Sequence, residues 1–414
     1  MVAHNYTALA QSTNFEEFSG EVLDDKTKKP LVFATLALEG SNVSTITNTE
    51  GEFSLKVPDS NTGSNLIISF LGYKTLTIPL AQFKSGKNEV LMTESVTKLS
   101  EVNLSVPKDA EELVRETLRK KGEKYINSPT VMTAFYRETI KKRKKNVSLS
   151  EAVVNIYKTP YSSNKTDDVK LYKARKSTDY SKLDTVALKL QGGPFNALFA
   201  DMVKYPDYIF TDESIGYYNF SFDGSTRVNN KLIYVVKFHQ KPGIIDPLYT
   251  GKLYIDAENK ILTSAIYSLN ITDKILAARM FVRKKPRNAE VWPTEVAYRV
   301  DYREKDGKWY YGYSNVLLEF KVDWDKRLFN SVFSMSCEMA VTDWEENLDN
   351  LAPKYKERMK SNIILSDEAI GFADPDFWGE YNIIEPEKSI ESAIKKIQRQ
   401  LRRTKDSDSG TSAP

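Results

Sequence analysis

The stretch that decides the fold of the first domain runs SGEVLDDKTKKPLVFATLALEG (19–40), STITNTEGEFSLKVP (44–58), LIISFLGYKTLTI (66–78) and EVLMTESVTKLSEVNLSV (89–106). Short apolar runs alternate with turn residues such as Pro30 and Gly72. Phe53, Leu55 and Val57 alternate with polar residues, which is the period-2 pattern of a strand with one buried face. Many short strands at even spacing predict a small β-sandwich over residues 15–106.

Five ordered motifs in this stretch resemble the carboxypeptidase-regulatory-like domain, a family common in cell-envelope proteins of Bacteroidota. The motifs are a G-x-V-x-D start, a P-L-x-x-A strand, a T-D-x-x-G-x-F turn, an S-x-x-G-Y strand and an L-x-E-V ending. They correspond here to 20–24, 30–34, 47–53, 69–73 and 99–102, with Asn48 in place of the usual Asp. The resemblance implies a seven-stranded transthyretin-like (Ig-like) sandwich that acts as a structural or docking module.

A second, larger domain is predicted over residues 107–345. Apolar residues at helical spacing predict a helix over 108–126, and Pro194–Tyr205 reads as a helical interruption. The remainder is a succession of tyrosine-rich and β-branched runs, which predicts an antiparallel meander. The GKLYID and SAIYS runs (251–256 and 264–268) are similar to a hairpin of lipoprotein-carrier proteins, which implies a curved, half-barrel-like sheet around an apolar cavity.

The two ends of the chain give weaker signals. Residues 1–14 include Thr7–Ala10, which looks like a signal-peptidase site, and predict a residual targeting segment. Residues 346–403 predict a C-terminal strap and a helix with an apolar stripe from Ile390 to Leu401, followed by a disordered tail over 404–414.

Composition and rare residues argue against catalysis. The 414 residues include only two histidines, His4 and His239, and neither has acidic partners at metal-ligand spacing, so a zinc peptidase site is not supported. The single cysteine, Cys337, lies in an alternating run and reads as a core residue. Lys+Arg 59 against Asp+Glu 56 does not suit a nucleic-acid binder, and no apolar run reaches transmembrane length. We therefore expect no catalytic residue, no metal and no cofactor.

Two basic segments are the candidate contact residues. Each lies between predicted strands and is predicted to be a hairpin tip, either simply solvated or in contact with lipid phosphates or an acidic partner. The segments are Lys141, Lys142, Arg143, Lys144 and Lys145, and Arg283, Lys284, Lys285 and Arg287.

The sequence thus predicts a mainly β, non-enzymatic binding or scaffold protein. We expect it in the periplasm or at the outer-membrane periphery, as a partner of outer-membrane proteins. The alternative is a carrier that encloses a lipid or a lipoprotein acyl chain in the second domain. An open apolar cavity would favour the carrier, and a filled sheet with an exposed patch would favour the partner.

Overall fold

The computed structural model describes residues 14–84, 86–97, 109–143, 145–178, 190–228, 231–325, 328–371 and 377–387. The predicted targeting segment, the C-terminal helix and the tail therefore lie outside the described residues, except for Asn14 and the start of that helix region at Glu387. Within the described residues, no helix combines the length and the apolar character needed to cross a membrane.

The N-terminal domain is the predicted seven-stranded sandwich. Its first sheet has the order β4-β1-β7 and its second the order β3-β2-β5-β6, with apolar side chains packed between them. The β1–β7 pair is parallel and the other pairs are antiparallel. The strands are β1 (Phe15–Asp24), β2 (Thr35–Leu38), β3 (Ser44–Ile46), β4 (Glu52–Pro58), β5 (Asn65–Ser69), β6 (Leu76–Pro79) and β7 (Lys87–Met92). Short 3₁₀ helices η1 (Asp59–Asn61) and η2 (Leu80–Gln82) connect them.

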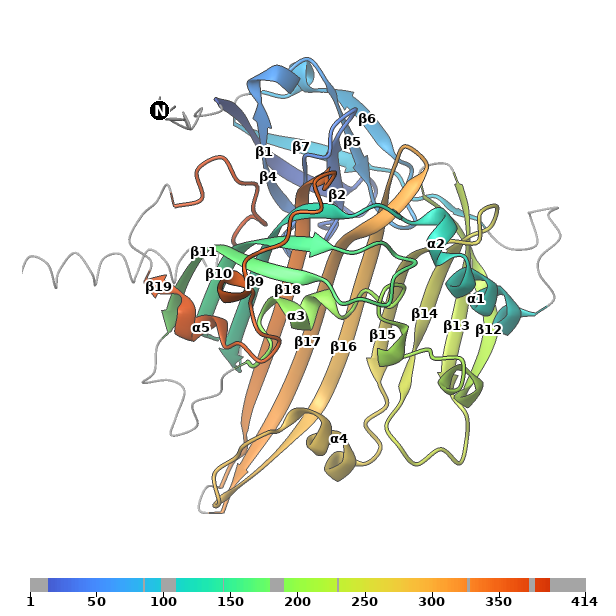
Figure 1. Cartoon of the computed structure of the whole chain (residues 1–414), viewed down its shortest axis with the longest axis vertical. Helices are drawn as coiled ribbons and strands as arrows, with labels where there is room; N and C mark the ends of the chain where they lie inside the picture. Colours follow the sequence, from blue (N-terminus) through green and yellow to red (C-terminus); the bar gives the residue numbers. More distant parts are fainter. Residues whose placement is uncertain are drawn as a thin grey trace, which may run out of the picture.

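The second domain is one large, open, curved sheet (Figure 1). Its strand order is β19-β11-β10-β9-β18-β17-β16-β15-β14-β13-β12-β8; the ten central strands pair antiparallel with one another, whereas β19 is parallel to β11. The two edge strands, β19 (Ile370–Gly371) and β8 (Val96–Thr97), are short, and β8 pairs with β12 although it falls inside the range predicted for the first domain. The others are β9 (Thr130–Lys142), β10 (Lys145–Lys158), β11 (Asp168–Thr178), β12 (Tyr218–Val228), β13 (Lys231–Gln240), β14 (Tyr249–Asp256), β15 (Leu262–Leu269), β16 (Ala289–Lys305), β17 (Lys308–Trp324) and β18 (Ser331–Glu346).

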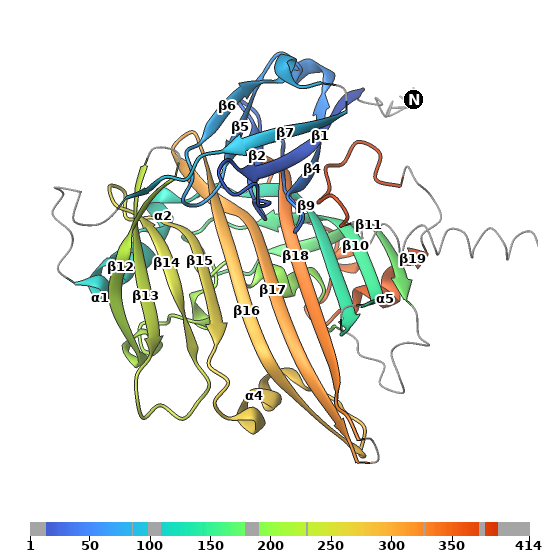
Figure 2. The same ribbon diagram turned by 180° about the vertical axis from the view of Figure 1, so that it is seen from behind.

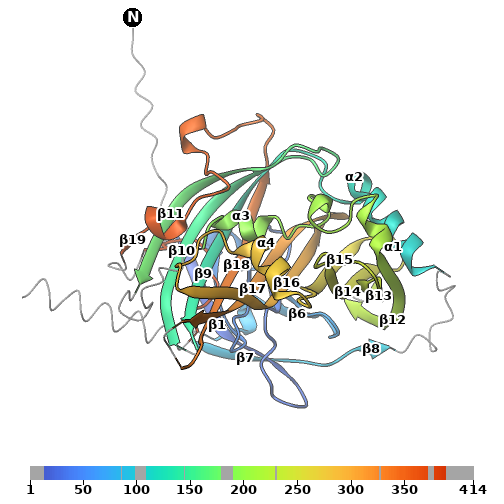
Figure 3. The same cartoon turned by 90° about the horizontal axis from the view of Figure 1, so that it is seen from below.

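Helices and turns line the concave face of this sheet, and the sandwich packs behind it (Figures 2 and 3). The predicted helix over 108–126 is α1 (Ala110–Arg119) followed by α2 (Lys121–Lys124), and Asp109 caps α1. The predicted helix Pro194–Tyr205 is shorter: α3 (Pro194–Leu198) gives way to turns and to η5 (Pro206–Tyr208) and η6 (Ser214–Tyr217). The turns bring Asp201 into the core, where it accepts hydrogen bonds from Lys158 and Tyr161.

Opposite faces of the central strands serve the two domains. Ser314 is buried on the concave side and donates to the carbonyl of Ala197 on α3. Its neighbour Tyr313 faces the other side, where its ring lies 5.1 Å from that of Phe33 in the sandwich. Strands with both faces covered explain the near-continuous burial along β9 and β10.

The C-terminal strap seals the contact between the domains. Trp378 and Ile384 belong to a small core shared by Ile46 of the sandwich and by the sheet. The strap also contains η7 (Tyr355–Glu357) and α5 (Leu365–Glu368). Asn382 exchanges two hydrogen bonds with the backbone of Lys56, so the strap continues the bonding of the sandwich edge. The described part of the chain therefore forms one continuous body.

Candidate functional site between the two domains

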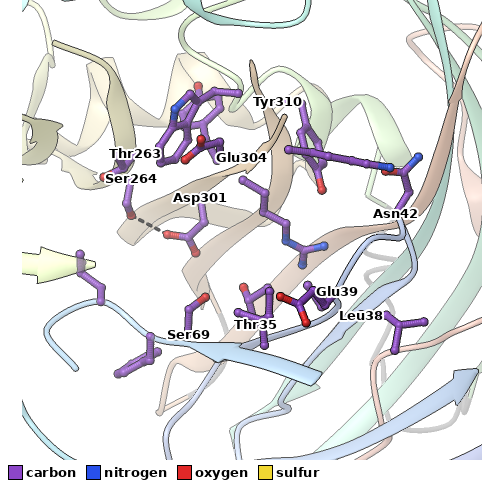
Figure 4. Close-up of a pocket in the computed structure, with 18 of the residues that line it drawn as sticks. Thr35, Leu38, Glu39, Asn42, Ser69, Thr263, Ser264, Asp301, Glu304 and Tyr310 are labelled. Atoms are coloured by element: carbon purple, nitrogen blue, oxygen red, sulfur yellow. Dashed lines mark hydrogen bonds between the residues drawn. The ribbon is translucent and has the colours of Figure 1, made fainter. Parts of the chain in front are cut away.

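A pocket of about 240 Å³ lies where the sandwich meets the curved sheet (Figure 4). One wall comes from β2, the turn after it and the end of β5, and the other comes from β15, the end of β16 and the start of β17. The pocket is thus built by segments more than 190 residues apart in the sequence. Only the docking of the two domains creates it.

The β16 wall carries three charged residues at alternating positions, Arg299, Asp301 and Arg303. Alternation places them on the same face of the strand, toward the sandwich. Asp301 is fully engaged: Ser264 Oγ donates to its Oδ1 at 2.5 Å and Arg299 Nε to its Oδ2 at 2.7 Å (Figure 4). Arg299 is in turn close to the Phe33 and Phe70 rings.

Arg303 is different because it is buried without a carboxylate partner among the described residues. Arg303 is 8% exposed, and within the described chain its Nη1 donates to the Ser44 hydroxyl at 2.5 Å and to the Val341 carbonyl at 2.8 Å. Nε and Nη2 have no hydrogen-bond partner within the described chain. Burial lowers the pKa of Arg303, an effect only partly offset by Asp301 and by Tyr310, whose hydroxyl lies close enough for a weak interaction with the guanidinium. The free energy cost of a buried, incompletely paired cation makes this arrangement unusual.

The other polar groups of the pocket differ in whether they are already hydrogen-bonded, and one backbone position is strained. Asn42 donates to the Trp344 carbonyl, but its Oδ1 has no described partner. Phe33 adopts φ 65°, in the left-handed region that bulky residues avoid. The acidic groups Glu39 and Glu304 are already bonded, to Asn65 and Lys231. The pocket wall therefore contains two unpaired donor atoms of Arg303 and one unpaired acceptor of Asn42, all three of them buried from solvent in the described structure.

The first predicted basic segment is a hairpin tip, as the sequence indicated. Lys141 and Lys142 end β9, Arg143 turns with φ 57°, and Lys145 begins β10. Lys141 Nζ lies 3.5 Å from Glu387, and Lys142 lies over the Phe333 ring. Arg143 and Lys145 are exposed, whereas Lys144 lies outside the described residues.

The prediction that the second basic segment is a hairpin tip is wrong. Arg283, Lys284, Lys285 and Arg287 follow a helix, α4 (Lys274–Phe281), that the sequence analysis missed. Asp273 caps this helix by accepting from the Ile275 and Leu276 amides, and good helix formers follow. That capping pattern was the signal available in the sequence.

The structure nevertheless brings the two basic segments to one end of the sheet. The Arg143 amide donates to the Val332 carbonyl at 2.9 Å, and the Asp325 amide donates to the Asn288 carbonyl at 3.2 Å. Both segments thus flank the turn between β17 and β18. The pocket residue Arg303 lies near the other end of β17, so the predicted contact residues and the pocket are separate.

Comparison with known proteins identifies the first domain only. Residues 18–104 match the CarboxypepD_reg-like domain, which confirms the predicted resemblance over this segment. No curated protein sequence matches the chain.

Three solved structures are similar to part of the chain, each with low identity and a low TM-score. A DUF1329 family protein from Desulfovibrio piger is 10% identical and has a TM-score of 0.25, covering 59% of this chain and 96% of its own. A putative outer membrane lipoprotein-sorting protein domain from Vibrio parahaemolyticus is 11% identical (TM-score 0.26; 60% and 94% covered). A LolA superfamily protein from Nitrosomonas europaea is 9% identical (TM-score 0.18; 58% and 97% covered). At these scores the likeness carries no inference about what this chain binds.

Proposed function

We propose that the chain is a non-catalytic binding protein of the cell envelope, located in the periplasm or at the outer-membrane periphery. In this proposal, the pocket between the domains holds a carboxylate of an outer-membrane partner protein. The observation that carries the proposal is the Arg303 guanidinium in the pocket wall, whose Nε and Nη2 are buried and unpaired within the described chain, so that a ligand would reach them by displacing the atoms that cover them. A bidentate carboxylate would satisfy both donors and neutralise the charge.

The rigidity of the surrounding walls supports a binding role. Ser44, Val341 and the strap hold the two domains together around the pocket, and Thr45 donates to the Ile383 carbonyl at 3.1 Å. A preformed site loses little conformational entropy when a ligand enters. The strained Phe33 backbone is the kind of local cost that persists where a site requires it.

The described chemistry gives little support to catalysis. His239 is near the end of β13, where its Nε2 lies 3.4 Å from the Asn219 amide nitrogen. Cys337 is buried, and burial raises the pKa of its thiol, so the thiolate nucleophile is suppressed. Neither residue lines the pocket.

The carrier alternative places a lipid on the concave face of the sheet. In the described residues that face is covered by α3 and the turns after it, whose Phe195, Leu198, Met202 and Phe210 side chains are buried in the main core. A carrier would have to expel this segment before an acyl chain could enter. Native mass spectrometry of protein purified without detergent distinguishes the two functions, because stoichiometric lipid would favour the carrier.

Site-specific photo-crosslinking tests the partner proposal directly. A benzoylphenylalanine in place of Ser69, on the pocket wall, is activated in intact envelopes, and the adducts are identified by mass spectrometry. We expect an outer-membrane protein among the adducts, and we expect Arg303→Met to remove it. Lys305→Met, which deletes a charge at the same pocket while leaving Arg303 in place, is the matched control. Recovery of the same adduct from Arg303→Met, or of no outer-membrane protein at all, would overturn the proposal.

A further inference from the structure

Three long connections lie at the strand ends farthest from the sandwich, which we call the distal end of the sheet. They join β13 to β14 (241–248), β15 to β16 (270–288) and β17 to β18 (325–330). Because the strands alternate in direction, all three connections lie at this same end of the sheet. Figures 1 and 2 show them as the lowest parts of the molecule, with the sandwich at the top.

Each connection presents large apolar side chains to solvent. Leu328 is 96% exposed and Phe329 is 79% exposed at the β17–β18 turn, and Ile245 is 81% exposed at the β13–β14 turn. On α4, Ile275 and Met280 are 60% and 41% exposed, while Ala277 faces the core. Single exposed apolar residues are common, but their recurrence on three adjacent connections marks an interaction surface.

Exposed cations surround these apolar groups. Arg143 and Lys145 lie on one side of the β17–β18 turn, and the segment after α4 lies on the other side with Arg283, Lys284, Lys285 and Arg287. Acidic groups are also present, since Asp246, Asp273 and Asp325 are exposed on these connections and Glu290 lies 3.8 Å from Lys274, but near the β17–β18 turn the described cations outnumber them. Basic side chains around protruding apolar groups are typical of proteins that bind at a membrane interface.

We infer that this distal end of the sheet docks on the surface of an anionic phospholipid bilayer. Leu328 and Phe329 would enter the boundary between headgroups and acyl chains, with Ile245, Ile275 and Met280 beside them. The cations would contact lipid phosphates, since each Lys or Arg near an anionic surface adds to the attraction. A partner protein is the competing occupant of the distal end. The apolar side chains are spread over separate convex loops, however, and this arrangement matches a flat, deformable bilayer better than a groove on a folded protein.

This docking also fixes an orientation. β17 contains 17 residues, so it spans roughly 55 Å at the usual rise per strand residue. β17 begins at the pocket and ends at the distal end of the sheet. The sandwich and the pocket would therefore be held away from the bilayer. The inference does not depend on what the pocket binds.

Vesicle flotation with the purified full chain tests the inference. The probes are vesicles of phosphatidylcholine alone and vesicles of phosphatidylcholine with phosphatidylglycerol. We expect binding to the anionic vesicles, weaker binding to the neutral ones and a loss of binding as salt is added. Leu328→Asp combined with Phe329→Asp should weaken binding by at least about tenfold. Arg283→Gln, Lys284→Gln and Lys285→Gln together should remove the preference for anionic vesicles.

The controls separate this inference from a folding defect and from the proposed function. Leu348→Asp changes an equally exposed leucine (82%) in the strap and should bind vesicles as the wild type does. Arg303→Met should also bind normally, because the pocket is at the other end of β17. Circular dichroism should be unchanged in all variants. Absence of binding to both vesicle types, or an equal loss with Leu348→Asp, would overturn the inference.

Discussion

The same substitution at two buried arginines should have different consequences for stability. Arg137 is 2% exposed and pairs with Glu151 and Glu338, at 2.7 and 3.3 Å. Burial lowers the pKa of Arg137, but the two carboxylates outweigh burial and raise the pKa above its ordinary value. Arg303 is also buried, at 8% exposed, but has no ion-paired carboxylate among the described residues.

Arg137→Met would leave the fully buried Glu151 with Arg175 as its one remaining cation among the described residues. Removal of one member of a buried ion pair costs about 3–5 kcal/mol, and we expect the lower end of this range because Arg175 remains. Arg303→Met loses two hydrogen bonds but also removes a desolvated charge. Ser44 Oγ still donates to the Val341 carbonyl at 3.2 Å, so the substitution leaves no new unpaired group there. We expect its free energy of unfolding to change by less than about 1 kcal/mol.

Urea denaturation followed by tryptophan fluorescence measures both variants. Arg137→Met should lower the urea midpoint by roughly 0.5–1 M, given the steep dependence expected for a chain of this size. Arg303→Met should leave the midpoint nearly unchanged while it removes the pocket crosslink. If Arg303→Met loses as much stability as Arg137→Met, then Arg303 is a structural residue and the argument for an unfilled site is refuted.

Three further outcomes follow from the described contacts. Burial raises the pKa of Glu138 to about 7, although a hydrogen bond from Tyr136 acts to lower the pKa. The folded state therefore keeps the Glu138 proton to a higher pH than the unfolded state does. The free energy of unfolding should fall by about 3 kcal/mol between pH 4.5 and pH 7. Glu138→Gln should remove that part of the pH dependence in urea melts, and an unchanged slope would contradict the assignment. Gly20→Ala should destabilise the sandwich by at least about 2 kcal/mol, because an added Cβ would lie 2.3 Å from the Asn88 carbonyl oxygen; calorimetry showing an unchanged melting temperature would contradict this. The Cys337 thiol should react with a thiol reagent only after urea unfolding, and rapid labelling of native protein would show that it is accessible.

Local sequence patterns were sufficient for the sandwich and for much of the sheet. The family motif begins at Gly20, where close packing against β7 excludes any side chain, so the sequence signal has a direct steric cause. The hairpin around Arg143 was also predictable, because a polar turn separates two β-rich runs. The predicted helix Pro194–Tyr205 is too long because a tertiary contact overrides the local pattern: the chain turns after α3 and places Asp201 in the core. The hairpin predicted at residues 283–287 is wrong for a local reason, since Asp273 is an N-cap that begins helix α4.

The sequence by itself determined that this protein is mainly β, that its first domain is a small β-sandwich and that two short segments are strongly basic. Alternation along strands and turn residues are local properties, so they can be read without a structure. Only the tertiary structure decided that Arg303 is buried beside an interdomain pocket, since its burial depends on a sandwich more than two hundred residues earlier in the chain. Only strand order placed Arg143 and Arg283 on either side of Leu328 and Phe329, because the register between distant strands is set by pairing across the sheet.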